Sequence, residues 1–130
     1  MSQLLNGQVE TSLNLGILEL KEDALTSLTS IRSSVKTRKE DLCARVTMLV
    51  EMLGGEAEVE GDYPAWEYRT DSALRPQVEK VYEELFHKKP VFSTIHAGLE
   101  CGLLSEKIPD LDCVSFGPDN FDIHTPKEHL

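Results

Sequence analysis

The sequence predicts a mixed α/β protein in two parts, because strand-like and helix-like patterns succeed each other along its 130 residues. Alternating apolar residues near the N-terminus predict antiparallel strands, and helical spacing follows in the middle of the chain. After Pro90, a strand, a helix and a second strand are expected in that order. Tyr63, Pro64 and Trp66 interrupt the pattern, so we place the boundary there and expect parts over residues 1–65 and 66–130.

The first part is predicted to begin with a β-hairpin. Leu13, Leu15 and Ile17 alternate with their neighbours, and a charged turn over residues 21–23 separates them from a second strand-like run that ends near Val35. Thr37 and Glu40 then have the spacing of a capping box. A helix is therefore expected over residues 38–53, ended by the glycines that follow it.

The second part is predicted to combine helices with parallel strands. A helix is expected over residues 72–87, with Pro76 tolerated only because it falls in the first turn. Strands over 91–95 and 113–117 flank a glycine-punctuated turn and helix over 96–107. A strand, helix and strand in this order imply a right-handed parallel crossover, and ligands gather at the carboxyl ends of such strands. The loops over 96–102 and 117–128 fall at those ends.

Composition argues against several classes of partner and indicates where the protein is located. Thirteen basic and 23 acidic residues give a net charge of −10, which argues against nucleic acid or an anionic membrane as the main partner. The longest apolar stretch, residues 46–53, is too short to span a bilayer. The N-terminus shows no secretory signal, and the three cysteines are too widely spaced for a disulfide framework. A reducing cytoplasm is the expected location.

The loop over residues 117–128 carries candidate metal ligands. Asp119, Asp122, His124 and Glu128 are of the types that zinc, manganese and cobalt accept. Their spacing fits no self-contained zinc motif, so an ordinary polar surface loop is the alternative.

The loop over residues 96–102 is the other candidate. It places His96 and Glu100 beside Gly98 and Gly102. Such a group is typical of a tight turn with satisfied polar side chains, and the catalytic alternative stays open.

Long segments of the chain resemble a known family of enzymes. IHAGLECGLLSEKIPDLDCVSFGP, followed by HTPKE, is similar to the C-terminal catalytic segment of bacterial aminoacyl-histidine dipeptidases, also called peptidase D or Xaa-His dipeptidases. LNLGIL, SIRSS and GDYPAW resemble the lid of the same enzymes and its return to the catalytic domain. The resemblance implies a partial lid and dimerisation domain over 1–65 and the C-terminal part of the catalytic domain over 66–130.

The resemblance also implies the chemistry. These cytoplasmic, homo-oligomeric dipeptidases belong to the co-catalytic zinc peptidases, in which two metal ions, with cobalt or manganese as alternatives to zinc, activate a water that hydrolyses the dipeptide. Most ligands and the general base come from an N-terminal half that carries an H-x-D motif, and neither that motif nor the lid's Gly-Gly-His segment occurs here. The chain alone is therefore expected to bind no catalytic metal and to be inactive. The alternative is a non-catalytic interaction or dimerisation module derived from this fold.

Individual residues take roles from the resemblance. His124 matches the C-terminal metal ligand, and Arg32 matches a lid arginine that clamps the substrate carboxylate. Gly98 and Glu100 lie in the turn that faces the substrate, where Glu100 either positions the substrate or braces the turn. Asp119, Asp122 and Glu128 are not ligands by this match, and Glu128 is expected to stabilise a helix or the loop. His96, Tyr63 and Trp66 are expected to be packing and hinge residues.

Overall fold

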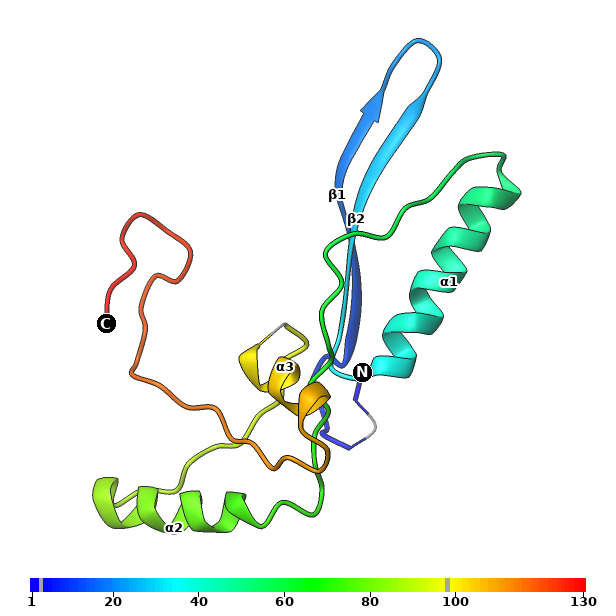
Figure 1. Cartoon of the computed structure of the whole chain (residues 1–130). Helices are drawn as coiled ribbons and strands as arrows, with labels where there is room; N and C mark the ends of the chain where they lie inside the picture. The colour runs from blue at the N-terminus through cyan, green and yellow to red at the C-terminus, as the bar shows by residue number, and fades with distance from the viewer. Residues whose placement is uncertain (3, 98) are drawn as a thin grey trace.

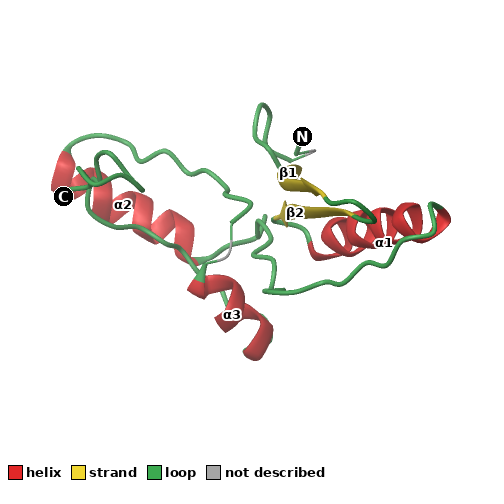
Figure 2. Cartoon of the chain, turned by 90° about the horizontal axis from the view of Figure 1, so that it is seen from above, coloured by secondary structure: helices red, strands yellow, loops and turns green. Residues whose placement is uncertain are grey.

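A computed structural model describes residues 1–2, 4–97 and 99–130. Its elements are two strands, β1 (Thr11–Leu20) and β2 (Leu25–Ser33), and three helices, α1 (Lys36–Met52), α2 (Leu74–Phe86) and α3 (Glu100–Lys107). Figure 1 shows α1 alongside the hairpin, α2 at the opposite end of the molecule and α3 between them. The view from above separates the same groups (Figure 2). The predicted mixed α/β class and the three helices are confirmed.

The hairpin forms as predicted, but its strands slip by one residue at Gly16. Leu15 pairs with Thr29 while Ile17 pairs with Leu28, so a β-bulge interrupts the ladder at the glycine. Paired residues share a face of the sheet, and neighbours alternate. The bulge therefore moves Ile17 away from the face of Leu15, whereas simple alternation predicts that both lie on one face.

Helix α1 starts with a tertiary cap rather than the predicted capping box. Its N-cap is Val35, which has no side-chain oxygen, and its first backbone N–H, that of Lys36, donates to Glu67 Oε1 at 3.0 Å. Ser33 Oγ accepts the N–H of Val35 at 3.0 Å. The expected end of the helix is confirmed, because Gly54 follows it with a φ of 81° that glycine adopts without strain.

Helix α2 is also capped by a residue that is distant in the sequence. Asp112 Oδ2 accepts the backbone N–H of Leu74 and the hydroxyl of Ser72, each at 2.9 Å, and Ser72 Oγ accepts the N–H of Arg75 at 3.0 Å. Pro76 lies in the first turn, as predicted. His87 ends the helix with a left-handed φ of 54°. These bonds join the 111–117 segment to the start of α2, across 38 residues of chain.

Acid is expected to weaken this cap. The hydrogen bond from Leu74 is the main cause that holds the pKa of Asp112 below its usual value, and Ser72 adds to it. A lowered pKa stabilises the fold above the ordinary aspartate range, and this contribution is lost as pH falls through the pKa of the folded state. We expect Asp112→Asn to flatten the dependence of helix content on pH below about pH 4, measured by circular dichroism. A dependence equally steep in the variant would contradict this role.

Helix α3 packs closely on the segment before α2. Gly102, in the first half of α3, is buried. A Cβ at this position would lie 2.8 Å from the backbone oxygen of Pro64 and 3.6 Å from that of Ala65. The glycine therefore permits the backbone of α3 to approach this segment.

The predicted parallel strands do not form in the part of the chain that the structure describes. Residues 91–95 and 113–117 are extended or irregular without strand pairing, and the one described sheet contains β1 and β2 alone. A strand needs a neighbour that accepts and donates its backbone hydrogen bonds. The backbone N–H of Thr94 instead donates to the side-chain Oε1 of Gln8, at 2.8 Å.

The described residues enclose little hydrophobic core. None of the described apolar side chains is buried, and Ser33, Ser34 and Gly102 are the described residues that are. The accessible surface is 10641 Å² for a mass of 14.6 kDa. A compact monomer of this mass exposes about 6,900 Å². None of the described helices combines the length and the apolar character needed to cross a membrane.

Candidate functional site

A small polar pocket lies on one face of the hairpin. It has a volume of about 290 Å³ and is lined, among the described residues, by Ser12, Asn14, Ser30, Arg32 and His96. Four of these come from the two strands and one from the loop that precedes α3. The pocket therefore joins two segments that lie far apart in the sequence.

The strand register places the four hairpin residues on one face. Ser12 pairs directly with Arg32, and Asn14 pairs with Ser30. Directly paired side chains project to the same side of the sheet, and residues two apart along a strand share that side. The bulge lies just beyond Asn14, so all four positions stay in phase.

Gln8 positions the loop that carries His96. Its Oε1 accepts the backbone N–H of Thr94 at 2.8 Å and the Thr94 hydroxyl at 2.7 Å. Thr94 lies two residues before His96, and Gln8 lies just before β1. The pair therefore holds the loop against the base of the hairpin, and His96 reaches the pocket from there.

The pocket combines groups that bind a carboxylate. A guanidinium offers a planar pair of N–H donors that match the two oxygens of a carboxylate. An imidazole, two hydroxyls and an amide add further hydrogen-bond donors around it. The resemblance predicts that Arg32 binds an anion, whereas it predicts only a packing role for His96. The polar alternation of Ser12 with Asn14 and of Ser30 with Arg32 is the sequence signal for this face.

The second predicted site, the loop with His124, is braced by its own side chains. Glu128 accepts the backbone N–H of His124 and the side-chain amide of Asn120, each at 3.0 Å. The bond from Asn120 is the larger cause that holds the pKa of Glu128 below its usual value. Phe121 and His129 close the loop through two backbone hydrogen bonds of 2.9 and 3.2 Å. The expected role of Glu128 as a loop stabiliser is confirmed.

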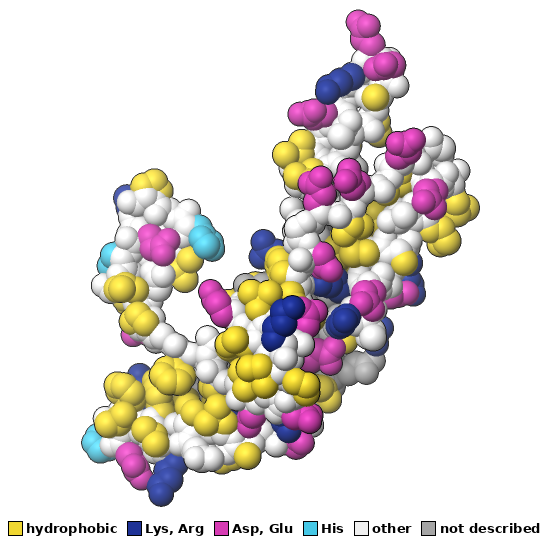
Figure 3. Space-filling model, viewed as in Figure 1, with side chains coloured by type: hydrophobic (Ala, Val, Ile, Leu, Met, Phe, Trp, Pro, Cys, Tyr) yellow, Lys and Arg dark blue, Asp and Glu magenta, His cyan; other side chains and the backbone are white. Residues whose placement is uncertain are grey.

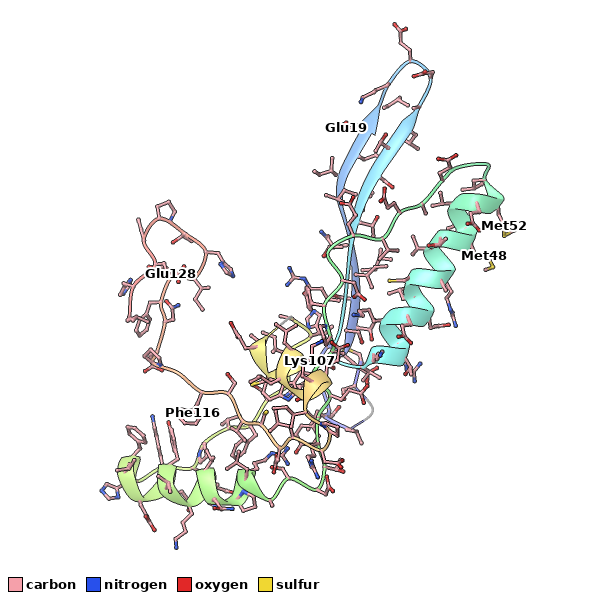
Figure 4. All side chains as sticks on the ribbon, viewed as in Figure 1. Glu19, Met48, Met52, Lys107, Phe116 and Glu128 are labelled. Atoms are coloured by element: carbon pink, nitrogen blue, oxygen red, sulfur yellow. The ribbon has the colours of Figure 1, made fainter. Side chains whose placement is uncertain are left out.

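The residues that the structure describes do not bring together a complete metal site. No three His, Cys, Asp or Glu side chains come together among residues 1–2, 4–97 and 99–130. A catalytic zinc needs about three protein ligands. The loop that holds Glu128 also curls away from the hairpin (Figures 1 and 4).

The remaining predicted residues belong to the turn before α3. Gly98 lies outside the described residues. Glu100 is exposed in the first turn of α3, where a negative charge interacts favourably with the helix dipole. Its part in substrate binding stays a prediction.

Known proteins are similar to this chain in sequence and in fold. No family model matches the chain. It is 35% identical, over 129 residues and 99% of its length, to the cytosol non-specific dipeptidase of Escherichia coli K12. The crystal structure of aminoacylhistidine dipeptidase from Vibrio alginolyticus matches 98% of the chain with a TM-score of 0.86 and 38% identity. The chain is therefore similar to bacterial dipeptidases in sequence and in fold.

This relationship covers a limited part of each dipeptidase. The chain spans 27% of the Escherichia coli protein and 26% of the Vibrio alginolyticus chain. At 38% identity and a TM-score of 0.86, the likeness extends to sequence as well as fold. The predicted resemblance to aminoacyl-histidine dipeptidases is thus confirmed, and it applies to about a quarter of such an enzyme.

Proposed function

We propose that the chain is the lid and C-terminal catalytic portion of a metal-dependent dipeptidase that hydrolyses Xaa-His dipeptides. The 129-residue match to one dipeptidase carries this proposal, and the TM-score of 0.86 with a second supports it. Residues 1–65 correspond to the partial lid and residues 66–130 to the catalytic part. We place the protein in the cytoplasm, in keeping with the name of the cytosolic relative, and expect it to be a homo-oligomer.

The polar pocket receives the carboxylate end of the dipeptide. Arg32 binds the carboxylate by paired hydrogen bonds, and His96, which also lines the pocket, contributes a further polar contact. Both groups bind and orient the substrate, and neither takes part in breaking the peptide bond. Glu100, in the first turn of α3, is the candidate for an additional contact near the same turn.

His124 supplies one ligand of a dinuclear zinc site, with cobalt or manganese as the alternative metals. The other ligands and the general base come from the part of the enzyme that lies outside this match. When bound, the metal pair supplies an activated water near neutral pH. Glu128 holds the His124 backbone in place through the 3.0 Å bond to its N–H. The chain by itself is inactive.

A chimeric enzyme tests this function. We expect the Escherichia coli dipeptidase to hydrolyse glycyl-histidine or β-alanyl-histidine when its 129 matched residues are replaced by this chain. The isolated chain should show neither turnover nor stoichiometric zinc binding by calorimetry. Within the chimera, His124→Ala should lower both the bound metal and the rate, because one ligand is lost.

A second histidine provides the control. His87 ends α2 in a left-handed conformation that asparagine also tolerates, so His87→Asn should change neither metal content nor rate. A well-folded chimera without dipeptidase activity would favour the interaction-module alternative. Turnover by the isolated chain would show that its own residues complete a site.

A further inference from the structure

Two of the three cysteines are neighbours in the fold. Cys101 lies in the first turn of α3, and Cys113 lies 12 positions later, in the extended segment that follows the helix. Figure 3 shows hydrophobic side chains gathered around α3, between the hairpin and α2. Both cysteines are free thiols and partly exposed, so a small solute can reach them. The proposed hydrolysis uses neither of them.

The geometry of α3 turns Cys101 toward the segment that holds Cys113. Ser105 of α3 and Cys113 line the same apolar pocket, which has a volume of about 1350 Å³. Cys101 precedes Ser105 by four positions, about one helical turn, so the two share a face of the helix. After α3 the chain turns, and the backbone N–H of Leu111 donates to the oxygen of Ile108 at 3.3 Å. The face with Cys101 therefore meets the segment with Cys113.

The two thiols interact with each other. Burial is the main cause that raises the pKa of the Cys101 thiol, and the Cys113 side chain adds to it through its charge and through a hydrogen bond between the two thiols. A disulfide forms only where the backbones of two cysteines lie close together. Thiols that share a hydrogen bond are candidates for such a pair.

Contacts on either side hold the two cysteines in place. Gly102 follows Cys101, and its backbone packs so closely on Pro64 that an added Cβ would lie 2.8 Å from the Pro64 oxygen. Asp112 precedes Cys113, and its carboxylate caps α2 at 2.9 Å. Each cysteine is thus next to a residue that is anchored to the stretch of chain before or at the start of α2.

We propose that Cys101 and Cys113 are a redox-sensitive pair, which hydrogen peroxide oxidises to an intramolecular disulfide that ties α3 to the segment capping α2. One thiolate attacks an oxygen of the peroxide, breaks the O–O bond and becomes a sulfenic acid, while the other oxygen leaves as water after protonation. The second thiol attacks this sulfur, forms the S–S bond and releases the remaining oxygen as water. Two thiols thus lose two protons and two electrons, and one peroxide becomes two waters. This proposal does not depend on the proposed function.

Thiol counting tests the proposal. The 130-residue chain is treated with a small excess of hydrogen peroxide, and its free thiols are counted with Ellman's reagent after unfolding. We expect the count to fall from three to one, the intact mass to fall by two hydrogen atoms, and peptide mapping to join Cys101 to Cys113. Dithiothreitol should reverse all three changes. The oxidised chain should have a Tm several degrees higher, because a disulfide restricts the unfolded chain.

The third cysteine provides the matched control. Cys43 lies in α1, so Cys43→Ser leaves the pair intact, and peroxide should still form the disulfide and raise Tm. Cys113→Ser removes one partner, so peroxide should form no intramolecular disulfide and should not raise Tm. If Cys113→Ser does not fold, the reduced and oxidised forms of the unsubstituted chain still give the comparison.

Three outcomes would overturn the proposal. All three thiols could remain free after peroxide treatment, or Cys101 and Cys113 could become sulfinic acids without an S–S bond. A disulfide through Cys43, within one chain or between two, would also overturn it, because the contact between Cys101 and Cys113 would then not set the pairing. None of these results concerns hydrolysis, so this proposal and the proposed function fail separately.

Discussion

Replacing Gly102 with alanine will destabilise the contact between α3 and the segment that precedes α2. The added Cβ would lie 2.8 Å from the backbone oxygen of Pro64, closer than carbon and oxygen approach without a shift. Overpacking of this kind costs about 1–3 kcal/mol. Alanine in a helix regains about 1 kcal/mol relative to glycine. We expect the clash to prevail, because the contacted atom belongs to the backbone and cannot rotate away.

Thermal unfolding of the chain or of the chimera measures this effect. We expect a lower Tm for Gly102→Ala, by several degrees, since about 1 kcal/mol shifts Tm by 4–8 °C in a small domain. Gly117→Ala is the control, because a Cβ at Gly117 would meet no atom within 4 Å. An unchanged Tm for Gly102→Ala would mean that α3 moves away from Pro64 without loss of stability.

Replacing Arg32 with alanine will weaken substrate binding in the chimeric enzyme. Arg32 lines the polar pocket with His96 and lies opposite Ser12 in the hairpin. Loss of a hydrogen bond to a charged group costs about 1.5–3 kcal/mol, so we expect KM for glycyl-histidine to rise roughly 10- to 100-fold. Because the group orients substrate rather than reacting, kcat should change less than KM.

Two further variants distinguish binding from loss of structure. Arg32→Lys retains the charge but loses the paired donors, so it should restore only part of the affinity. Arg45→Ala removes an arginine from the exposed face of α1, where it pairs with Asp41 at 3.0 Å, and should leave KM unchanged. If all three variants raised KM equally, the pocket would have no specific role.

Local patterns account for most of the secondary structure. The hairpin, α1 and α2 follow from apolar periodicity, and α3 follows from the glycine-punctuated segment over 96–107. The ends of α1 and α2, at Gly54 and His87, fall within about two residues of the expected helix ends. The similarity of the HAGLECG and HTPKE segments to dipeptidases also follows from the sequence, because it depends on the order of residues. In the same way, residue order alone makes Arg32 a candidate for substrate binding and His124 a candidate metal ligand.

Long-range contacts determine the helix caps and the pairing of strands. The capping box at Thr37 is not used, because Glu67 accepts the first free N–H of α1, and Asp112 does the same for α2. No local pattern indicates such caps, since each joins residues more than 30 positions apart. The expected parallel strands over 91–95 and 113–117 do not form, because no neighbouring strand supplies their hydrogen bonds in the described chain.

The candidate site also depends partly on residue order and partly on the tertiary structure. Residue order establishes a dipeptidase-like chain with a hairpin, three helices and an arginine suited to a carboxylate. Folding in three dimensions is what places His96 beside Arg32, through the bonds from Thr94 to Gln8, and keeps Asn14 in phase with Ser12 on the near side of the bulge. Local propensity acts over a few neighbouring residues, whereas the pocket and the helix caps depend on hydrogen bonds between segments that meet only after the chain has folded.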